Sequence, residues 1–138
     1  KMPVTDLMSE RPELLPSLTL AYIGDVVYEL AVRQHLLEKG IYKVNDMHKA
    51  AVGLVCAKTQ AVLVHLLEDE FTETENAVMH RGRNAKGQHN PKSVPVTTYR
   101  QATGLEALIG YWYLTKDELR LGWFFERLWQ FAEAEKTE

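Results

Sequence analysis

The chain has 138 residues, of which 46% are apolar and 25% charged, a composition that fits one folded globular domain. The single cysteine, Cys56, excludes an internal disulfide framework and a cysteine-based zinc site, and it favours a reducing, cytoplasmic environment. No apolar run approaches the roughly 18 residues of a membrane-spanning helix. The polar start of the chain also lacks the apolar segment of a secretion signal.

Apolar residues at helical spacing predict three helices in the first half of the chain. The first begins at Ser17, read as an N-cap after Pro16, and ends near Lys39-Gly40. Its helical spacing is carried by Leu20, Ile23, Val27, Leu30 and Leu37. A second helix, capped by Asn45 or Asp46, extends to about residue 55. A third continues to residue 68, with Ala57, Ala61, Val64 and Leu67 or Glu68 on successive turns.

Cap signals define three further helices in the second half. The stretch "TETE" from Thr72 to Glu75 is a capping box and opens a helix that fades at Gly82. Thr97 or Thr98 can cap a helix to about residue 115, and Asp117 a last helix to about residue 135. With no convincing strand pair, we expect a single all-α domain over residues 1–138, a helical bundle.

The segment 85–97, "AKGQHNPKSVPVT", interrupts this helical pattern. Gly87, Pro91 and Pro95 are incompatible with a regular helix, so we expect a long exposed loop. A loop of this length in a compact domain is usually functional.

The charge distribution is more informative than the net charge of −3. From Asn76 to Leu105 the sequence contains no Asp or Glu, so this window is basic on an otherwise acidic chain. Such segregation indicates a polyanionic partner. The basic residues of the window are Arg81, Arg83, Lys86, Lys92 and Arg100.

Two carboxylates stand in apolar surroundings far apart in the chain. Asp25 lies within "LAYIGDVVYEL", directly after Gly24, and Glu106 lies within "ATGLEALIGYWYL". A buried, unpaired carboxylate is costly, and a glycine destabilises a helix by roughly 1 kcal/mol relative to alanine. Both features are explained if two helices cross closely through small residues and hold a cation between two buried acids. The small residues are Ala21 and Gly24 on one side, and Ala102, Thr103, Ala107 and Gly110 on the other.

Oxygen ligands of this kind suit Mg²⁺, with Mn²⁺ as a substitute, rather than zinc. Taken singly, an acid in a helix is most often a solvated side chain or half of an ion pair with Arg or Lys. Glu29, one turn after Asp25, could be a further ligand, but its position four residues before Arg33 favours a helix salt bridge. His35, His48 and His65 are read as packing or surface residues.

The two motifs together resemble those of the ribonuclease III family. "LAYIGDVVYEL" is similar to its signature helix, and "LEALIGYWYL" to its second acidic motif, in the same order. "RGRNAK" from Arg81 to Lys86 and "YR" before the second motif resemble the short bacterial branch, Mini-ribonuclease III. The resemblance covers roughly residues 18–128.

The resemblance implies an all-α homodimer that cleaves double-stranded RNA with Mg²⁺, leaving 5′-phosphate and 3′-hydroxyl ends. It implies that Asp25 and Glu106 are the catalytic metal ligands, that no separate double-stranded-RNA-binding domain is present, and that the substrate is the 23S ribosomal RNA precursor. Two positions depart from the full-length enzymes, which carry acids where this chain has Ala21 and Thr103. The number of metal ions is therefore open, and the alternative is a non-catalytic protein of the same fold that binds structured RNA.

The basic window is the expected RNA-binding segment, since duplex RNA is recognised mainly through shape, phosphate and 2′-hydroxyl groups. Arg81, Arg83, Lys86 and Lys92 are expected to contact RNA, and Arg100 either does so or supports the helix of the second motif. The aromatic residues near the end of the chain are expected to be mostly core, with some available for a dimer interface. These are Trp112, Tyr113, Trp123, Phe124, Phe125, Trp129 and Phe131.

Overall fold

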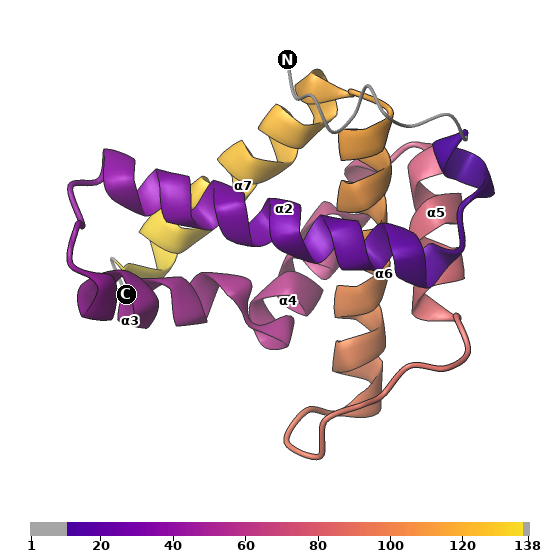
Figure 1. Ribbon diagram of the computed structural model, residues 1–138, viewed down its shortest axis with the longest axis horizontal. Helices are drawn as coiled ribbons and strands as arrows, with labels where there is room; N and C mark the ends of the chain where they lie inside the picture. Colours follow the sequence, from indigo (N-terminus) through magenta and orange to yellow (C-terminus); the bar gives the residue numbers. More distant parts are fainter. Residues whose placement is uncertain (1–10, 137–138) are drawn as a thin grey trace.

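Helices account for all regular secondary structure in the computed structural model, which describes residues 11–136 (Figure 1). The all-α prediction is therefore confirmed, and each of the six predicted helices is present. In chain order the elements are η1 (Pro12–Leu14), α2 (Ser17–Glu38), α3 (Val44–Val55), α4 (Ala57–Leu67), η2 (Glu68–Glu70), α5 (Glu73–Arg83), α6 (Val96–Leu114) and α7 (Glu118–Lys136).

Two of the predicted helix caps are confirmed. Thr72 Oγ1 accepts a hydrogen bond from the Glu75 amide at 3.1 Å, and Glu75 Oε1 accepts one from the Thr72 amide at 2.9 Å, which together make the capping box. Asp117 Oδ1 accepts from the Arg120 amide at 3.2 Å at the start of α7. These bonds satisfy backbone donors that have no partner within the helix.

The caps assigned to the other three helices are wrong by one or more residues. The N-cap positions of α2, α3 and α6 are Pro16, Lys43 and Pro95, and none of them caps through its side chain. The candidates Ser17, Asn45 or Asp46, and Thr97 or Thr98 lie inside the helices instead. Pro16 and Pro95 have the extended ψ of a residue that precedes a helix. Helix α2 therefore begins one residue earlier than its predicted cap would place it, and α6 begins two or three residues earlier.

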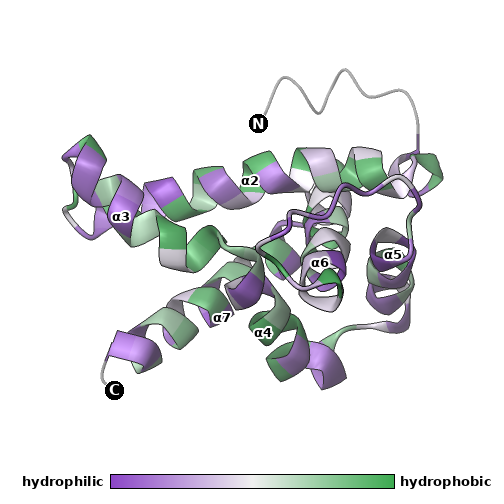
Figure 2. Cartoon of the chain, turned by 90° about the horizontal axis from the view of Figure 1, so that it is seen from below, coloured by the Kyte–Doolittle hydropathy of each residue, from purple (hydrophilic) through white to green (hydrophobic). Residues whose placement is uncertain are grey.

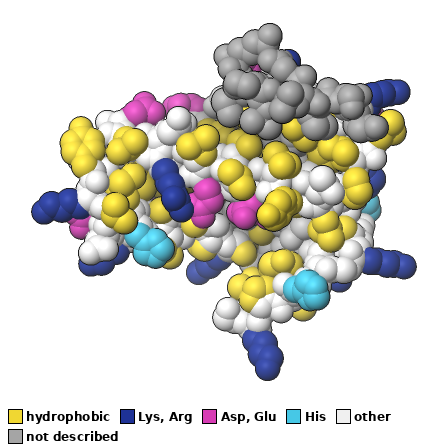
Figure 3. Space-filling view, in the orientation of Figure 1, with side chains coloured by type: hydrophobic (Ala, Val, Ile, Leu, Met, Phe, Trp, Pro, Cys, Tyr) yellow, Lys and Arg dark blue, Asp and Glu magenta, His cyan; other side chains and the backbone are white. Residues whose placement is uncertain are grey.

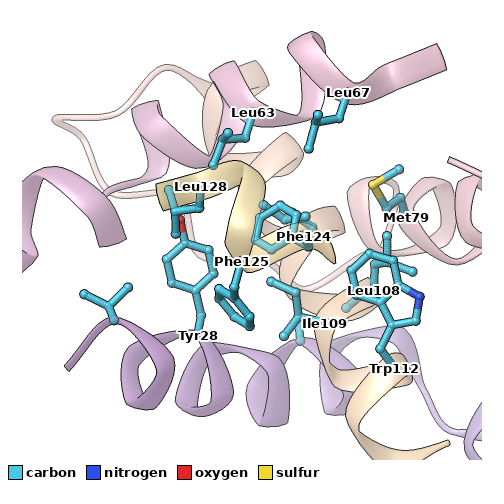
Figure 4. Packing of buried hydrophobic residues seen from close by; sticks show 14 of the residues in the cluster. Tyr28, Leu63, Leu67, Met79, Leu108, Ile109, Trp112, Phe124, Phe125 and Leu128 are labelled. Carbon is cyan, nitrogen blue, oxygen red and sulfur yellow. The ribbon is translucent and has the colours of Figure 1, made fainter. Parts of the chain in front are cut away.

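Helix α6 is the central element, and α2, α4 and α5 all pack against it (Figure 1). Its Leu105, Leu108 and Ile109 have no exposed surface, and neither does Trp112. In Figure 4, Leu108, Ile109 and Trp112 lie among side chains from α2, α4, α5 and α7. A helix enclosed on so many sides places any side chain it carries, including Glu106, inside a rigid framework.

The buried face of α2 differs from the face that apolar spacing indicated. Leu20 is buried as expected, but Leu30 and Leu37 are 50% and 47% exposed. The stripe that faces the core instead consists of Leu20, Gly24, Tyr28, Val32 and Leu36. Tyr28 reaches into the core and donates a hydrogen bond from its hydroxyl to the Leu54 carbonyl at 2.7 Å, which ties α2 to the end of α3.

Within residues 11–136 no single helix has the length and apolar character needed to cross a membrane. Only α3 taken together with the α4–η2 segment meets that test, as a pair bent by 44°.

Candidate functional site

The site is built on a close crossing of α2 and α6. A Cβ atom added to Gly24 would lie 2.7 Å from the Glu106 carbonyl carbon and 2.8 Å from the Gly110 amide nitrogen. A Cβ added to Gly110 would lie 2.9 Å from the Leu20 carbonyl carbon. Both glycines are therefore needed because the two backbones touch. This close crossing is the explanation that the sequence analysis gave for a glycine inside each helix.

This crossing places the side chains of Asp25 and Glu106 next to each other, close enough for each to act on the other. Both line one hollow of about 250 Å³, whose walls also include Tyr22, Tyr99 and residues 87–89. Two acids that are far apart in the sequence thus share one small site.

The charges around Glu106 are negative. Burial first, and then the charge of Asp25, raises the pKa of the Glu106 carboxyl to about 8, and the charge of Glu29 adds to this. A hydrogen bond from the Gln60 side chain acts in the opposite direction.

The expectation that both acids are buried is wrong for Asp25. Glu106 is mostly covered, whereas Asp25 is exposed on the outer face of α2. Its apolar neighbours Tyr22 and Val26 are 78% and 62% exposed, so the apolar stretch around Asp25 is a surface rather than a core. Figure 3 shows acidic side chains in the middle of this face of the molecule, with hydrophobic side chains around them.

The two departures from the ribonuclease III pattern also line this hollow. Ala21 and Thr103 stand beside Asp25 and Glu106, so the positions where longer enzymes carry acids are occupied here by small residues. Among residues 11–136, no group of three or more His, Cys, Asp or Glu side chains is arranged to hold a metal ion. The carboxylate pair is consistent with Mg²⁺, which often takes one or two protein carboxylates and keeps several waters.

The connection between α5 and α6, residues 84–95, passes beside the acid pair through Gly87, Gln88 and His89. In Figure 2 this connection is largely purple. Gln88 Nε2 donates to the carbonyls of Gly82, Arg83 and Ala85 at 3.3, 3.1 and 2.8 Å, which holds the start of the connection against the end of α5. Within the described part of the chain, the buried Gln88 Oε1 has no hydrogen-bond partner.

The basic residues expected to contact RNA are all exposed, but they do not form one patch. Lys86 and Lys92 belong to the α5–α6 connection beside the acid pair. Arg81 lines a different hollow with Glu73 and Tyr111, and Arg83 lines a third with His65 and His80. The cause is geometric, because residues two apart on a helix point in nearly opposite directions.

Arg100 and Glu29 both make local contacts of the kind that the sequence suggested. Arg100 donates to the Arg83 carbonyl at 3.5 Å, which agrees with its alternative role as a support between α5 and α6. The Glu29–Arg33 salt bridge is present at 3.5 Å.

The three histidines expected in packing or surface roles lie away from the acid pair. His35 stacks on Trp129 at a ring distance of 3.9 Å, His65 is exposed beside Glu68, and His48 lines the groove between α2 and α3.

Apart from Tyr113, the aromatic residues expected in the core belong to it or pack against it. Trp112, Phe124 and Phe125 are buried, while Trp123, Trp129 and Phe131 are partly buried against the same cluster. The most exposed aromatic residues are instead Tyr22 and Tyr42, at 78% and 73%.

The sequence analysis did not identify Gln60 as a neighbour of Glu106. Gln60 is only 2% exposed and lies on α4 in the buried stripe with Leu63 and Leu67. The expected stripe of Ala57, Ala61 and Val64 is only partly buried. A polar residue at a core position of an otherwise apolar stripe was the available signal, since a buried amide needs a partner.

Comparison with known proteins supplies an independent finding. Residues 18–117 match the Ribonuclease III domain family. A "Mini-ribonuclease 3" from Desulfitobacterium hafniense is 56% identical over 119 residues, which cover 86% of this chain and 75% of the relative. One from Symbiobacterium thermophilum is 47% identical over 122 residues, covering 88% and 94%.

A solved structure agrees in fold. The crystal structure of a protein from Fusobacterium nucleatum superimposes with a TM-score of 0.79 at 30% sequence identity. The match covers 88% of this chain and 98% of that one.

Proposed function

The chain belongs to the ribonuclease III family, and we propose that it is a divalent-metal-dependent endoribonuclease that cleaves double-stranded RNA. The relatives that it matches over most of their length carry the name Mini-ribonuclease 3, which designates a ribonuclease. The observation that carries the proposal is the contact between the Asp25 and Glu106 side chains across the α2–α6 crossing.

Asp25 and Glu106 are the residues that would hold the metal ion. Their carboxylates are adjacent, and the charges that act on Glu106 come from Asp25 and Glu29, which are both negative. A divalent cation would relieve this repulsion, and carboxylate oxygens are the ligands that Mg²⁺ and Mn²⁺ prefer. When bound, such an ion supplies a hydroxide-like water at neutral pH and stabilises negative charge on a phosphate.

The two acids contribute in different ways. Glu106 projects from the enclosed helix α6, whose neighbouring residues Leu105 and Ala107 are fully buried, so its backbone is held in a rigid framework before substrate arrives. Asp25 is exposed, so it would be accessible to a phosphodiester group. Hydrolysis then adds water across the bond between phosphorus and the 3′ oxygen, leaving a 5′-phosphate and a 3′-hydroxyl.

The α5–α6 connection is the segment that would contact the RNA backbone nearest the site. Lys86 and Lys92 are exposed on it, and residues 87–89 line the hollow that contains the acid pair. Arg81, Arg83 and Arg100 are exposed at its two ends and would meet more distant phosphates. Such contacts release counterions, so RNA affinity falls steeply with salt concentration.

The exposed face of α2 supports a homodimer. Tyr22, Val26 and Leu30 are 78%, 62% and 50% exposed and surround Asp25. The adjoining groove of about 390 Å³ between α2 and α3 is lined by Val44, Met47, Val52 and other apolar residues. A second copy is the occupant that would cover the apolar residues of this face and the adjoining groove while leaving Asp25 open to RNA, so that two acid pairs act on the two strands of one duplex.

The natural substrate that we propose is the precursor of 23S ribosomal RNA, cleaved in the cytoplasm. This substrate is what the resemblance of the two acidic motifs to Mini-ribonuclease III implies, and the names of the relatives add only that they are ribonucleases. The alternative function, RNA binding without cleavage, is favoured by Ala21 and Thr103, which leave the hollow with fewer acids than longer enzymes have.

A cleavage assay tests the proposal. Purified protein is incubated with a duplex RNA and Mg²⁺ or Mn²⁺, and compared with Asp25→Asn and Glu106→Gln. We expect cleavage by the wild type and a loss of at least about 10²-fold in each variant, because each removes a charged ligand from the ion. The exposed Glu126→Gln on α7 is the matched control and should cleave like the wild type.

The outcomes separate the alternatives. Cleavage that persists in both variants contradicts the site, and salt-sensitive binding of duplex RNA without cleavage by the wild type favours the non-catalytic function.

A further inference from the structure

The side-chain amide of Gln88 caps the carboxyl end of α5 from outside the helix. A helix leaves its last carbonyls without partners of its own, and α5 ends at Arg83. Gln88 Nε2 donates to the Gly82 carbonyl at 3.3 Å and to the Arg83 carbonyl at 3.1 Å. It also donates to the Ala85 carbonyl, just past the helix, at 2.8 Å. Because an NH₂ group has two hydrogens, at least one of them is shared between two carbonyls.

A turn at Gly87 brings Gln88 back to the helix end. Gly87 has a φ of +89°, in the left-handed region that favours glycine, and nothing lies within 4 Å of a Cβ added there. The glycine is therefore explained by the backbone conformation of the turn and not by close packing. With this turn, the α5–α6 connection supplies the cap of the helix that it follows.

The capped end of α5 packs closely against the helix that carries Glu106. A Cβ added to Gly82 would lie 2.9 Å from the Ala107 Cβ and 3.0 Å from the Gly104 Cα. Gly104 and Ala107 precede and follow Glu106 in α6. The amide of Gln88 thus joins the connection to a part of α5 whose distance from the backbone around Glu106 is set by close packing.

The connection held in this way lies beside the acid pair. Residues 87–89 line the same hollow as Asp25 and Glu106, and Lys86 is exposed at the start of the turn. A lysine on an untethered loop would have to be ordered when RNA binds, and the entropy lost would be subtracted from the binding free energy. A connection that is already ordered avoids this loss.

The oxygen of the same amide argues against a role in space filling. Gln88 Oε1 is buried and has no hydrogen-bond partner within residues 11–136. A buried acceptor without a partner is unfavourable, so an apolar side chain of the same length would be preferred if the position only needed to be filled. The hydrogen bonds from the nitrogen are what offsets this penalty.

We propose that Gln88 is a positioning residue that holds the α5–α6 connection, with Lys86, beside the acid pair before RNA binds. This inference rests on the proposed function for its effect on RNA, whereas the ordering of the connection can be measured on the RNA-free protein.

The test compares Gln88→Met, which removes the donor but keeps the side-chain length, with Gln88→Glu, which places a carboxylate against the carbonyls. The matched controls are Gln101→Met, a half-buried position on α6 outside the hollow, and Gln130→Glu, an exposed position on α7. Opening of the connection is followed by tryptic cleavage of the native protein after Lys86, with the fragments identified by mass spectrometry. Cleavage after Lys58, inside α4, reports global unfolding in the same sample.

We expect tryptic cleavage after Lys86 to be about 3- to 10-fold faster in Gln88→Met, since one net hydrogen bond is lost. The effect should be larger in Gln88→Glu, because the carboxyl end of a helix repels a carboxylate. Cleavage after Lys58 should be unchanged in both, and the controls should match the wild type at both lysines.

The same variants are then compared in cleavage of duplex RNA. The KM should rise at least about threefold in both Gln88 variants while kcat stays within about twofold, because RNA must then order the connection itself. A role in stability alone would accelerate tryptic cleavage after Lys58 as well as Lys86 and lower the unfolding temperature.

Wild-type rates of tryptic cleavage after Lys86 in both Gln88 variants overturn the inference. Equal acceleration at Lys58 and Lys86, or faster cleavage after Lys86 without a change in KM, also overturns it. If Gln88→Glu does not fold, Gln88→Met decides. Wild-type protein that leaves duplex RNA intact, while Gln88 still protects Lys86 from trypsin, upholds the ordering of the connection and contradicts the proposed function alone.

Discussion

Asp25 and Glu106 have different surroundings although their side chains are in contact. Glu106 projects from the enclosed helix α6 and is mostly covered, whereas Asp25 projects from the exposed face of α2. What keeps the two together is the absence of a side chain at Gly24, where α2 meets the backbone of α6. The site thus depends on a residue that makes no chemical contribution of its own.

Replacement of Gly24 by alanine should destabilise the protein strongly. The new methyl group would lie 2.7 Å from the Glu106 carbonyl carbon and 2.8 Å from the Gly110 amide nitrogen, so the helices must move apart. We expect a loss of at least about 2 kcal/mol in the free energy of unfolding, measured by urea denaturation, since overpacking against rigid atoms costs about 1–3 kcal/mol.

Gly122→Ala is the control for this substitution. Gly122 lies in α7 with nothing within 4 Å of an added Cβ, so alanine there should stabilise the protein by up to about 1 kcal/mol. Equal effects of the two substitutions would show that the α2–α6 crossing is looser than described.

The start of α5 and the start of α7 are joined by a buried network around Glu75. Arg120 donates to both carboxylate oxygens of Glu75 at 2.8 Å, and Trp112 Nε1 donates at 3.0 Å. The Arg120 guanidinium also lies 4.0 Å from the centre of the Trp123 ring. Burial acts to raise the pKa of Glu75, but hydrogen bonds from Arg120, the Thr72 amide and Trp112 lower it below its ordinary value.

Glu75→Gln should therefore destabilise the protein by about 3 kcal/mol at pH 7, because it leaves Arg120 without a charged partner in a half-buried place. Since the folded pKa of Glu75 is below its unfolded value of 4.5, this stabilisation is present above pH 4.5 and is lost as the pH falls through the folded pKa. In urea unfolding at several pH values, the difference in the free energy of unfolding between wild type and variant should become smaller below pH 4.5.

Glu70→Gln is the comparison for this pH dependence. Glu70 pairs with Arg127 at 2.7 Å on the surface, where an ion pair contributes about 0–1 kcal/mol. If the difference in the free energy of unfolding between wild type and Glu75→Gln stays constant from pH 7 to below pH 4, Glu75 does not stabilise the protein through its charge.

The molecule as a whole presents one face that is unusual for an isolated domain. Along α2, exposed apolar residues alternate with Asp25 and Glu29, and the α2–α3 groove continues this surface (Figure 3). An exposed patch of this kind commonly marks an interface. In the proposed homodimer it would become the boundary between two catalytic centres.

Tyr22→Glu should weaken the dimer, because it places a charge in the middle of this face, where Tyr22 is 78% exposed. We expect sedimentation or light scattering to show a monomer at concentrations where the wild type is dimeric, with duplex cleavage reduced at the same concentrations. Leu119→Glu is the control, since Leu119 is 87% exposed on α7 and should leave assembly unchanged. A monomeric wild type, or a dimeric Tyr22→Glu variant, would contradict this interface.

Much of the fold was predictable because six helices follow from periodicity and local caps such as Thr72 and Asp117. The approach of Asp25 to Glu106 was also predictable, because a glycine inside a helix next to an acid has few structural explanations. Which face of α2 is buried could not be predicted, because an exposed apolar face has the same spacing as a core face. Leu30 and Leu37 fit the expected core spacing but are exposed for that reason. Gln60 carries no charge pattern, so only the packing of α4 on α6 shows that it is buried in the core.

The spacing of the acid pair is set by main-chain atoms of α2 and α6 that touch at Gly24 and Gly110. Neither carboxylate depends on the shape of a neighbouring aliphatic side chain for its distance to the other. Core residues away from this crossing, such as Leu63 or Phe124, can therefore change in size during evolution. Such changes are expected to alter the unfolding temperature while the reaction at the acid pair stays the same.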